Sequence, residues 1–148
     1  MKILIATQSN LNSWLDMRKK LWPETSDELH LVEIKSMLSQ QNKFICYIAF
    51  DNDNHVGFIE SSIREDIDEG CIIKNIGYIE GWYIEKTSRN KGVGKKLVEA
   101  VENWSRDHGC FTIGSDTNLE NDTSQKAHLS LGFEEVDRAI HYRKKLET

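Results

Sequence analysis

Residues 89–94, with the sequence RNKGVG, hold two glycines one position apart. An apolar pattern typical of a strand precedes them, and a helical pattern follows them. A glycine-rich turn that enters a helix presents unpaired backbone N–H groups and the positive end of the helix dipole, and both attract anions. The chemistry that this segment favours is therefore the binding of a phosphorylated ligand.

Two well-known phosphate-binding patterns do not fit this segment. A P-loop requires GxxxxGK[ST], but aligning Gly94 with its second glycine puts Arg89 at the first glycine and Lys96 at the Mg²⁺-binding hydroxyl. A dinucleotide fingerprint requires GxGxxG near the start of a βαβ unit, but Leu97 stands where its third glycine belongs. The sequence therefore supports neither ATP or GTP hydrolysis nor dinucleotide binding.

A third pattern, R/Q-x-x-G-x-G/A, is matched at Arg89, Gly92 and Gly94. Downstream, residues 121–133 (NDTSQKAHLSLGF) are similar to the segment N-x-x-A-x-x-L-Y-x-x-x-G-F. On these two motifs the chain resembles the GCN5-related N-acetyltransferase family, from about Phe44 to the C-terminus. The resemblance implies an α/β (α+β) fold in which a mixed, mostly antiparallel central sheet is flanked by helices.

The same resemblance implies the residues that bind acetyl-coenzyme A, with no metal required. The glycine-rich loop wraps the pyrophosphate, the backbone N–H of Ile84 donates to the thioester carbonyl and polarises it, and Asn121 and His128 contact the coenzyme. The implied loop residues are Arg89, Asn90, Lys91, Gly92, Val93, Gly94 and Lys95.

His128 is a departure from the family pattern. Many members have at this position a tyrosine that protonates the departing coenzyme A thiolate. A histidine can donate a proton near neutral pH, but it can equally be a helix residue that contacts the coenzyme. Tyr142 is the alternative acid, and a thiolate can also leave without one.

Within the family, the chain is similar from end to end to the aminoglycoside 6′-N-acetyltransferases, bacterial resistance enzymes that acetylate the 6′-amine of kanamycin- or tobramycin-like antibiotics. The segments that carry this similarity are LWP at 21–23, YIEGWYI at 78–84, SDT at 115–117, SQKAHLSLGFEE at 124–135 and HYRKK at 141–145. The resemblance also implies a homodimer.

A polycationic sugar should meet carboxylates and aromatic faces. Glu80 lies in the strand before the glycine loop, and Asp116 ends the next strand, so the resemblance assigns both to the amines of the acceptor. Either could be the general base, a role that contributes about 10²–10⁴-fold to rate. The structural alternatives are an outward-facing strand residue for Glu80 and a helix or turn cap for Asp116.

Two further residues are candidates for contact with the acceptor. Pro23 places Trp22 in a loop, where its ring either stacks on the acceptor or anchors the core. Asp137 either adds to the negative surface that meets the acceptor or is a solvated strand carboxylate.

The rest of the sequence predicts the elements that position these residues. A capping box at Thr25 and Glu28 starts the second helix, and Gly77 and Gly81 inside a strand pattern suggest a bulge or a close backbone approach. The predicted strands are 2–6, 44–50, 55–64, 72–85, 110–116 and one or two within 133–146; the predicted helices are 11–21, 25–40, 93–104 and 122–131; residues 51–54 form a hairpin turn and 65–71 a polar loop. No linker interrupts this order, so we expect one domain over residues 1–148.

Composition limits the classes of partner. The formal net charge of −5 argues against a binder of nucleic-acid backbones and is compatible with a cationic partner. The three cysteines are widely spaced, which predicts reduced thiols rather than disulfides or a metal centre. Without a long apolar run or a signal sequence, the expected protein is soluble and cytoplasmic.

Two alternatives to the antibiotic-modifying function stay open. The first is acetylation of a polyamine, a protein N-terminus or another small amine, for which the acetyl-coenzyme A motif would look the same. The second is an acetyl-coenzyme A sensor without catalysis. The presence of both Glu80 and Asp116 speaks against the sensor.

Overall fold

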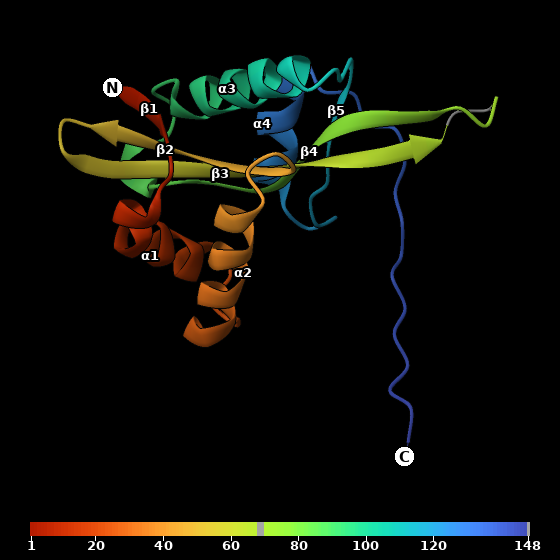
Figure 1. Cartoon of the computed structure of the whole chain (residues 1–148), viewed down its shortest axis with the longest axis horizontal. Helices are drawn as coiled ribbons and strands as arrows, with labels where there is room; N and C mark the ends of the chain where they lie inside the picture. The colour runs from red at the N-terminus through yellow and green to blue at the C-terminus, as the bar shows by residue number, and fades with distance from the viewer. Residues whose placement is uncertain (68–69, 148) are drawn as a thin grey trace. The chain divides into compact units, whose positions relative to one another are not determined.

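The computed structural model describes residues 1–67 and 70–147 (Figure 1). By its internal contacts the chain divides into two compact units, Met1–Asp116 and Thr117–Thr148. The single domain expected over residues 1–148 stays a prediction.

The first unit is built on a five-stranded sheet in the order β1-β2-β3-β4-β5. The strands are β1 (Lys2–Ile5), β2 (Phe44–Asp51), β3 (Asn54–Ile67), β4 (Ile73–Ile84) and β5 (Ile113–Ser115). All neighbouring strands are antiparallel except β4 and β5, which are parallel. The mixed, mostly antiparallel sheet predicted from the sequence is confirmed.

Three helices cover this sheet: α1 (Leu11–Leu21), α2 (Asp27–Ser39) and α3 (Val93–Asp107). Figure 1 shows α1 and α2 on one face of the sheet and α3 on the other. Two layers of helix around a sheet bury both of its faces, which explains why the central strands read as nearly continuous apolar runs.

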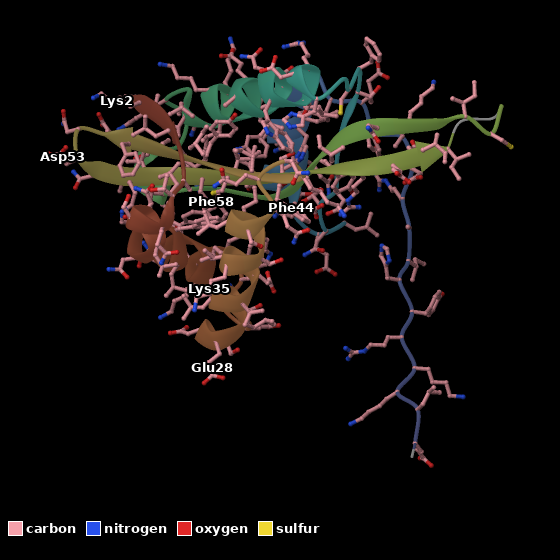
Figure 2. All side chains as sticks on the ribbon, in the orientation of Figure 1. Lys2, Glu28, Lys35, Phe44, Asp53 and Phe58 are labelled. Carbon is pink, nitrogen blue, oxygen red and sulfur yellow. The ribbon has the colours of Figure 1, made fainter. Side chains whose placement is uncertain are left out.

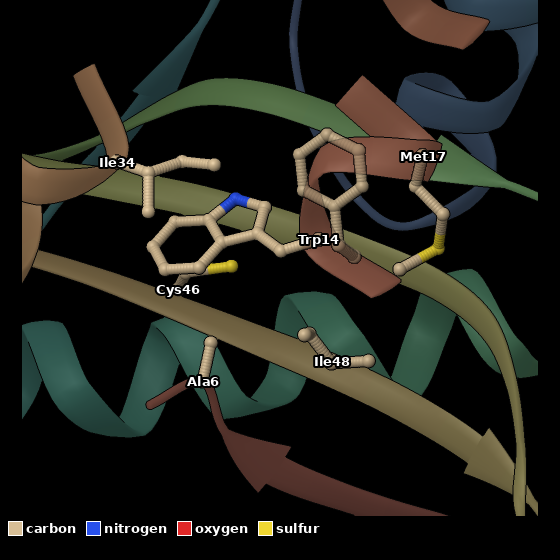
Figure 3. Close-up of a cluster of buried hydrophobic side chains, with 7 residues drawn as sticks. Ala6, Trp14, Met17, Ile34, Cys46 and Ile48 are labelled. Carbon is tan, nitrogen blue, oxygen red and sulfur yellow. The ribbon is translucent and has the colours of Figure 1, made fainter. Parts of the chain in front are cut away.

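The core between the sheet and the α1–α2 pair gathers around the indole of Trp14, which Figure 3 shows next to Ile34 and Cys46. Phe58, labelled in Figure 2, extends this cluster from β3 toward α1. On the opposite face, α3 buries residues at helical spacing, namely Val93, Leu97, Val98, Val101 and Trp104. This spacing is the 3.6-residue period expected of an amphipathic helix.

Several predicted element boundaries were wrong. β5 spans only Ile113–Ser115 of the predicted 110–116, and α3 runs past 104 to Asp107. The N-cap of α2 is Ser26, one residue after the predicted cap Thr25. Ser26 has an extended backbone, and its side chain accepts the N–H of Leu29. Strand β3 continues to Ile67, where it still pairs with Ile73 of β4, so residues 65–67 of the predicted polar loop are strand. Residues 68–69 of that loop lie outside the described residues.

The close approaches predicted at two glycines of β4 are confirmed. A Cβ atom at Gly77 would lie 2.1 Å from Ser105 Oγ of α3. A Cβ atom at Gly81 would lie 2.4 Å from the ring of Trp22 on the opposite face. These two positions therefore let the flanking layers reach the backbone of β4.

The second unit contains α4 (Asp122–Ser130), after which the described chain has no regular secondary structure from residue 134 to 147. The strands predicted within 133–146 are therefore absent from the described residues. Apolar and polar residues do alternate here, but a strand also needs a partner for its N–H and C=O groups. Among the described residues, no segment pairs with this one.

All three cysteines are free thiols, as predicted, with Cys46 and Cys110 buried and Cys71 exposed. None of the described helices combines the length and the apolar character that crossing a membrane requires.

Charged side chains are also buried between α1 and β3. Arg18 and Glu60 are each 2% exposed, and Arg18 Nε lies 3.2 Å from Glu60 Oε2. Trp14 Nε1 donates to the same oxygen at 2.7 Å, and Arg18 also pairs with Glu33. Burial raises the pKa of Glu60 to about 7, although Arg18 and Trp14 oppose the shift.

This raised pKa makes stability fall with pH. The folded state holds the Glu60 proton up to about pH 7, while the unfolded chain releases it near 4.5. The contribution to stability is therefore full below pH 4.5 and is lost as the pH rises to 7, by up to about 3 kcal/mol at 1.36 kcal/mol per unit. We expect urea unfolding of the wild-type protein to show this loss relative to Glu60→Gln; parallel stability curves for the two proteins would contradict it.

Candidate active site

Strand β4 carries a bulge in the middle of its pairing with β3. Glu60 pairs with Gly81 and Ser61 pairs with Ile79, so Glu80 has no opposite residue. A bulge re-aims the side chains beside it, and here both Glu80 and Gly81 face the α1–α2 layer. The contacts of Glu80 with Ser62 and those of Gly81 with the Trp22 ring establish this.

Three hydrogen bonds hold the Glu80 carboxylate. Ser62 Oγ donates to Oε1 at 2.6 Å, and Arg64 donates from Nε to Oε1 at 3.0 Å and from a terminal nitrogen to Oε2 at 2.7 Å. The Glu80 side chain is nevertheless 32% exposed. Glu80 is thus held in a fixed position by its partners and can still be reached by solvent and ligands.

Arg64 and Tyr78 connect Glu80 to Asp116. The Arg64 guanidinium carbon lies 3.6 Å from the centre of the Tyr78 ring, and Tyr78 Oη donates to Asp116 Oδ2 at 2.8 Å. Burial, followed by the hydrogen bond to Asp116, raises the pKa of Tyr78 to about 12, so the phenol stays a donor. The structure brings the two sequence-predicted acids into one network.

Trp22 lies against the same part of β4. Its ring packs over Gly81, near the rings of His30 and Phe58 at 6.4 and 6.3 Å and the guanidinium of Arg18 at 4.9 Å. Trp22 is only half-buried. The packing agrees with the core-anchor interpretation, and the exposed part of the ring leaves acceptor stacking open.

Sequence reasoning missed Ser62, Arg64 and Tyr78. Ser62 and Arg64 follow the buried Glu60 at alternate positions of β3, and this run of polar residues on one face of a strand was the available signal. This signal indicates which face of β3 is polar, but it does not identify the side chain that these residues contact. That contact depends on the register between β3 and β4.

The loop before α3 has the backbone that a glycine pair predicts. Asn90 and Gly92 have positive φ angles of 62° and 83°, and no side chain caps the first N–H groups of α3. Arg89 Nε donates to the carbonyl of Ile84 at 3.0 Å, which ties the loop to the end of β4. A Cβ atom at Gly94 would lie 2.9 Å from the Trp82 ring, so this glycine is needed for packing as well.

The backbone N–H of Ile84 points away from β3. Glu85 donates its N–H to Val56 at 2.9 Å, and ladder contacts alternate along an antiparallel pair, so Ile84, opposite Gly57, directs its N–H and C=O to the other edge of β4. On that edge β5 pairs only with residues 77–79. The position is geometrically suited to donating to a bound carbonyl.

The remaining candidates lie in the second unit. Asn121 Oδ1 accepts the N–H of Ser124 at 3.0 Å and so caps α4. His128 Nδ1 donates to the Ser124 carbonyl at 2.7 Å, which leaves the lone pair of the neutral ring on Nε2, so the ring needs a second proton to act as an acid. Tyr142 is 90% exposed, and Asp137 is exposed as well.

Among the described residues, one other cluster has side chains of the types that bind metal ions. Atoms of Asp16, His55 and Glu85 lie within 4.8 Å of one another. Lys20 Nζ stands between the two acids, 3.4 Å from Asp16 and 2.9 Å from Glu85. An internal ammonium group thus neutralises these carboxylates.

Residues 11–133 match the model of the acetyltransferase (GNAT) family. The chain belongs to this family. The matched range includes the residues of the glycine loop, the β4 bulge and α4.

Similar proteins come from within the same family. The aminoglycoside N(6′)-acetyltransferase type 1 of Salmonella typhimurium is 38% identical over 98% of this chain and 99% of its own length. The Klebsiella aerogenes protein of the same name is 41% identical over 90% of each chain. The structure of AAC(6′)-Iy in complex with the bisubstrate analogue CoA-S-monomethyl-acetylneamine has a TM-score of 0.89 and 37% identity, covering 98% of each chain.

The contact between Gly81 and Trp22 can be tested by a double-mutant cycle. Because a Cβ atom at residue 81 would overlap the indole, we expect Gly81→Ala to lower the free energy of unfolding by about 1–3 kcal/mol. In a Trp22→Ala background, the same Gly81→Ala change should lower the free energy of unfolding by at least about 1 kcal/mol less than in the wild type. Urea unfolding of the four proteins measures this coupling. An equal cost in both backgrounds would show that the overlap does not set the role of Gly81.

Proposed function

We propose that the chain transfers the acetyl group of acetyl-coenzyme A to the 6′-amine of aminoglycoside antibiotics, and so confers resistance to them. The observation that carries this proposal is the similarity to an aminoglycoside N(6′)-acetyltransferase, which is 38% identical in sequence over 98% of this chain. The site supports the proposal, because the carboxylates of Glu80 and Asp116 and the ring of Trp22 lie along residues 78–81 of β4. Such groups suit a polycationic sugar.

The loop before α3 is the proposed binding site for the coenzyme pyrophosphate. The uncapped N–H groups at the start of α3 fit an anion, and residues 86–98 contain no acidic side chain. Arg89 holds this loop in place through Ile84. The proposed coenzyme-binding residues are Ile84, Arg89, Asn90, Lys91, Gly92, Val93, Gly94, Lys95, Asn121 and His128.

Asp116 is the proposed general base. Within the described part of the chain its carboxylate has one hydrogen bond, from Tyr78, so its second oxygen can take a proton from the amine. Glu80 already accepts from Ser62 and Arg64. We therefore assign Glu80 to binding the amines, with Trp22 and Asp137 as further acceptor contacts, and keep it as the alternative base.

Acetyl-coenzyme A supplies the thioester. The amine nitrogen bonds to the acetyl carbon while the carbon–sulfur bond breaks, Asp116 takes the amine proton, and the thiolate departs. The N–H of Ile84 donates to the acetyl carbonyl oxygen. His128, once doubly protonated, or Tyr142 returns a proton to the thiolate.

We infer that the enzyme acts as a homodimer. This inference comes from the family resemblance and is supported by the apolar side chains that residues 136–146 expose, with Val136 at 88% and Ile140 at 73%.

The proposed substrate is tested with a panel of amines. Purified protein and acetyl-coenzyme A are mixed with kanamycin, tobramycin, spermidine or a peptide, and release of free thiol is followed. We expect turnover with the two antibiotics, and none with an analogue whose 6′-amine is replaced by a hydroxyl. Reaction with spermidine or the peptide alone would instead favour the polyamine or protein N-terminus alternative, and no reaction at all would favour the sensor.

The two carboxylates are tested by substitution. We expect Asp116→Asn to lower kcat by about 10²–10⁴-fold, the usual contribution of a positioned base. Glu80→Gln should mainly raise KM for the aminoglycoside, because it removes an anion from the acceptor site. Glu65→Gln, at another exposed carboxylate of the β3–β4 pair, is the matched control and should change neither constant. Wild-type kcat in Asp116→Asn would remove Asp116 as the base.

The glycine loop is tested with a control that has the same backbone strain. Gly92 and Gly109 flank α3 with φ angles of 83° and 77°, and neither has a heavy atom near its missing Cβ. Gly92→Ala and Gly109→Ala should each lower the free energy of unfolding by about 1–2 kcal/mol. Only Gly92→Ala should weaken coenzyme A binding, by about tenfold or more if one N–H contact to a phosphate is lost. Calorimetric titration measures the affinity, and equal effects of both variants would contradict the proposed phosphate site.

A further inference from the structure

Arg64 lies between the two acids of the candidate active site. It is on the same face of β3 as Ser62, which pairs with Tyr78 across the β3–β4 ladder. The Arg64 guanidinium carbon stands 3.6 Å from the centre of the Tyr78 ring. Two nitrogens of the same group donate to the Glu80 carboxylate, and the Arg64 side chain is 47% exposed. Arg64 therefore contacts both Glu80 and the tyrosine that donates to Asp116.

The hydrogen bonds of Glu80 leave only one of its oxygens partly open. A carboxylate can accept about four hydrogen bonds, two at each oxygen. Oε1 already accepts from Ser62 Oγ at 2.6 Å and from Arg64 Nε at 3.0 Å. Among the described residues, Oε2 accepts only from a terminal nitrogen of Arg64, at 2.7 Å. An ammonium group can therefore bond to Oε2 while the pair with Arg64 stays closed.

Asp116 is held in a similar way. Tyr78 Oη donates to Asp116 Oδ2 at 2.8 Å, which is the one hydrogen bond of this carboxylate within the described part of the chain. Oδ1 is left for the acceptor. Tyr78 thus contacts Arg64 with its ring and Asp116 with its hydroxyl. Through this one side chain, the positions of the two carboxylates depend on each other.

We propose that Arg64 is a positioning residue of the acceptor site: seated on the Tyr78 ring, it fixes Glu80 so that Oε2 receives an ammonium group of the acceptor. Arg64 acts through Glu80 and does not touch the reacting amine. The planar fork of a guanidinium suits this role, because it bonds to both oxygens of a carboxylate at once. A carboxylate that is already fixed in the free enzyme needs no ordering when the acceptor binds, which favours affinity.

This inference rests on the proposed function, because it takes Glu80 to bind the amines of the acceptor. It deepens that function by naming the groups that set the position of the Glu80 carboxylate and the oxygen that the acceptor meets. The partners of Glu80 are all in the first unit, on β3 and β4.

Replacing Arg64 by lysine separates geometry from charge. Arg64→Lys keeps the positive charge but removes the planar fork. We expect KM for kanamycin to rise by about three- to tenfold, because a loosely held Glu80 must be ordered each time the acceptor binds. The value of kcat should change little, since the lost interaction is made equally in the ground state and the transition state. A wild-type or lower KM in Arg64→Lys would overturn the proposal.

Arg106→Lys is the matched control. Arg106 is an exposed arginine of α3, on the other face of the sheet, where it donates to Asn103. The same substitution there should change neither KM nor kcat. An equal rise of KM in Arg106→Lys would contradict a role specific to Arg64.

A double-mutant cycle tests whether Arg64 acts through Glu80. In a Glu80→Gln background, Arg64→Lys should change KM by less than about twofold, because no carboxylate is left to position. The four proteins are compared with kanamycin at a fixed, saturating concentration of acetyl-coenzyme A. If Arg64→Lys raises KM by the same factor in both backgrounds, Arg64 does not act through Glu80 and the proposal falls.

The pair can also be measured without any substrate. An arginine Nε–H can be followed by nuclear magnetic resonance, and a hydrogen bond to a carboxylate slows its exchange with water. We expect the Nε–H of Arg64 to exchange about tenfold or more slowly than that of Arg106, which donates from a terminal nitrogen. Glu80→Gln should remove this difference. Equal exchange of the two arginines in the wild-type protein would overturn the proposal.

Failure of this inference is distinguishable from failure of the proposed function. KM is also measured with spermidine and the peptide wherever they turn over. If only one of these reacts, the antibiotic assignment is wrong, but a rise of its KM in Arg64→Lys that disappears in Glu80→Gln would still support the positioning role. Acetylation of kanamycin with the same KM in the wild type and in Arg64→Lys would do the reverse.

Discussion

The extra residue in β4 is the constraint on which the candidate active site depends. Because the bulge lies at Glu80, this side chain and Gly81 both face the α1–α2 layer, and the following residue, Trp82, faces α3, where its ring packs on Gly94. In an unbroken strand, Glu80 and Trp82 would share one face. The bulge thus serves both proposed sites. On one face it directs the Glu80 carboxylate toward the proposed acceptor site. On the other face it places Trp82 against the start of α3, whose first N–H groups form the proposed phosphate site.

Arg64 gives Glu80 a counter-ion before any substrate binds. A bidentate pair with a guanidinium fixes both carboxylate oxygens, so an incoming ammonium group must share or displace this contact. Such a partner holds the carboxylate in place and occupies one lone-pair direction of each oxygen. Asp116 has no such cation among the described residues and receives only the Tyr78 hydroxyl. The proposed division of roles, with Glu80 as the anchor and Asp116 as the proton acceptor, rests on this difference in partners.

Local patterns predicted most elements of the first unit, because the periods of two and 3.6 record which faces the core covers. Glu80 and Asp116 were named by the family resemblance, and the structure places Glu80 at the β4 bulge and Asp116 directly after β5. Ser62, Arg64 and Tyr78 could not be found in this way, because their contacts with the two acids depend on the β3–β4 register and on a bulge that shifts it by one residue. The start of α2 was misplaced by one residue for a related reason: Thr25 and Ser26 are both good caps, and only the backbone geometry chooses between them.

The strand expected within residues 133–146 failed in a different way. Alternation reports which side of a strand would be buried, but the ladder that makes it a strand belongs to two segments. In β2 and β3 both segments lie in the same chain, so the local pattern and the observed structure agree. In residues 134–147 the same kind of pattern stands beside exposed apolar side chains, and no segment among the described residues pairs with it. The failed prediction therefore shows what a local pattern leaves out: it indicates that a segment could be a strand, but it does not identify the partner strand on which the ladder depends.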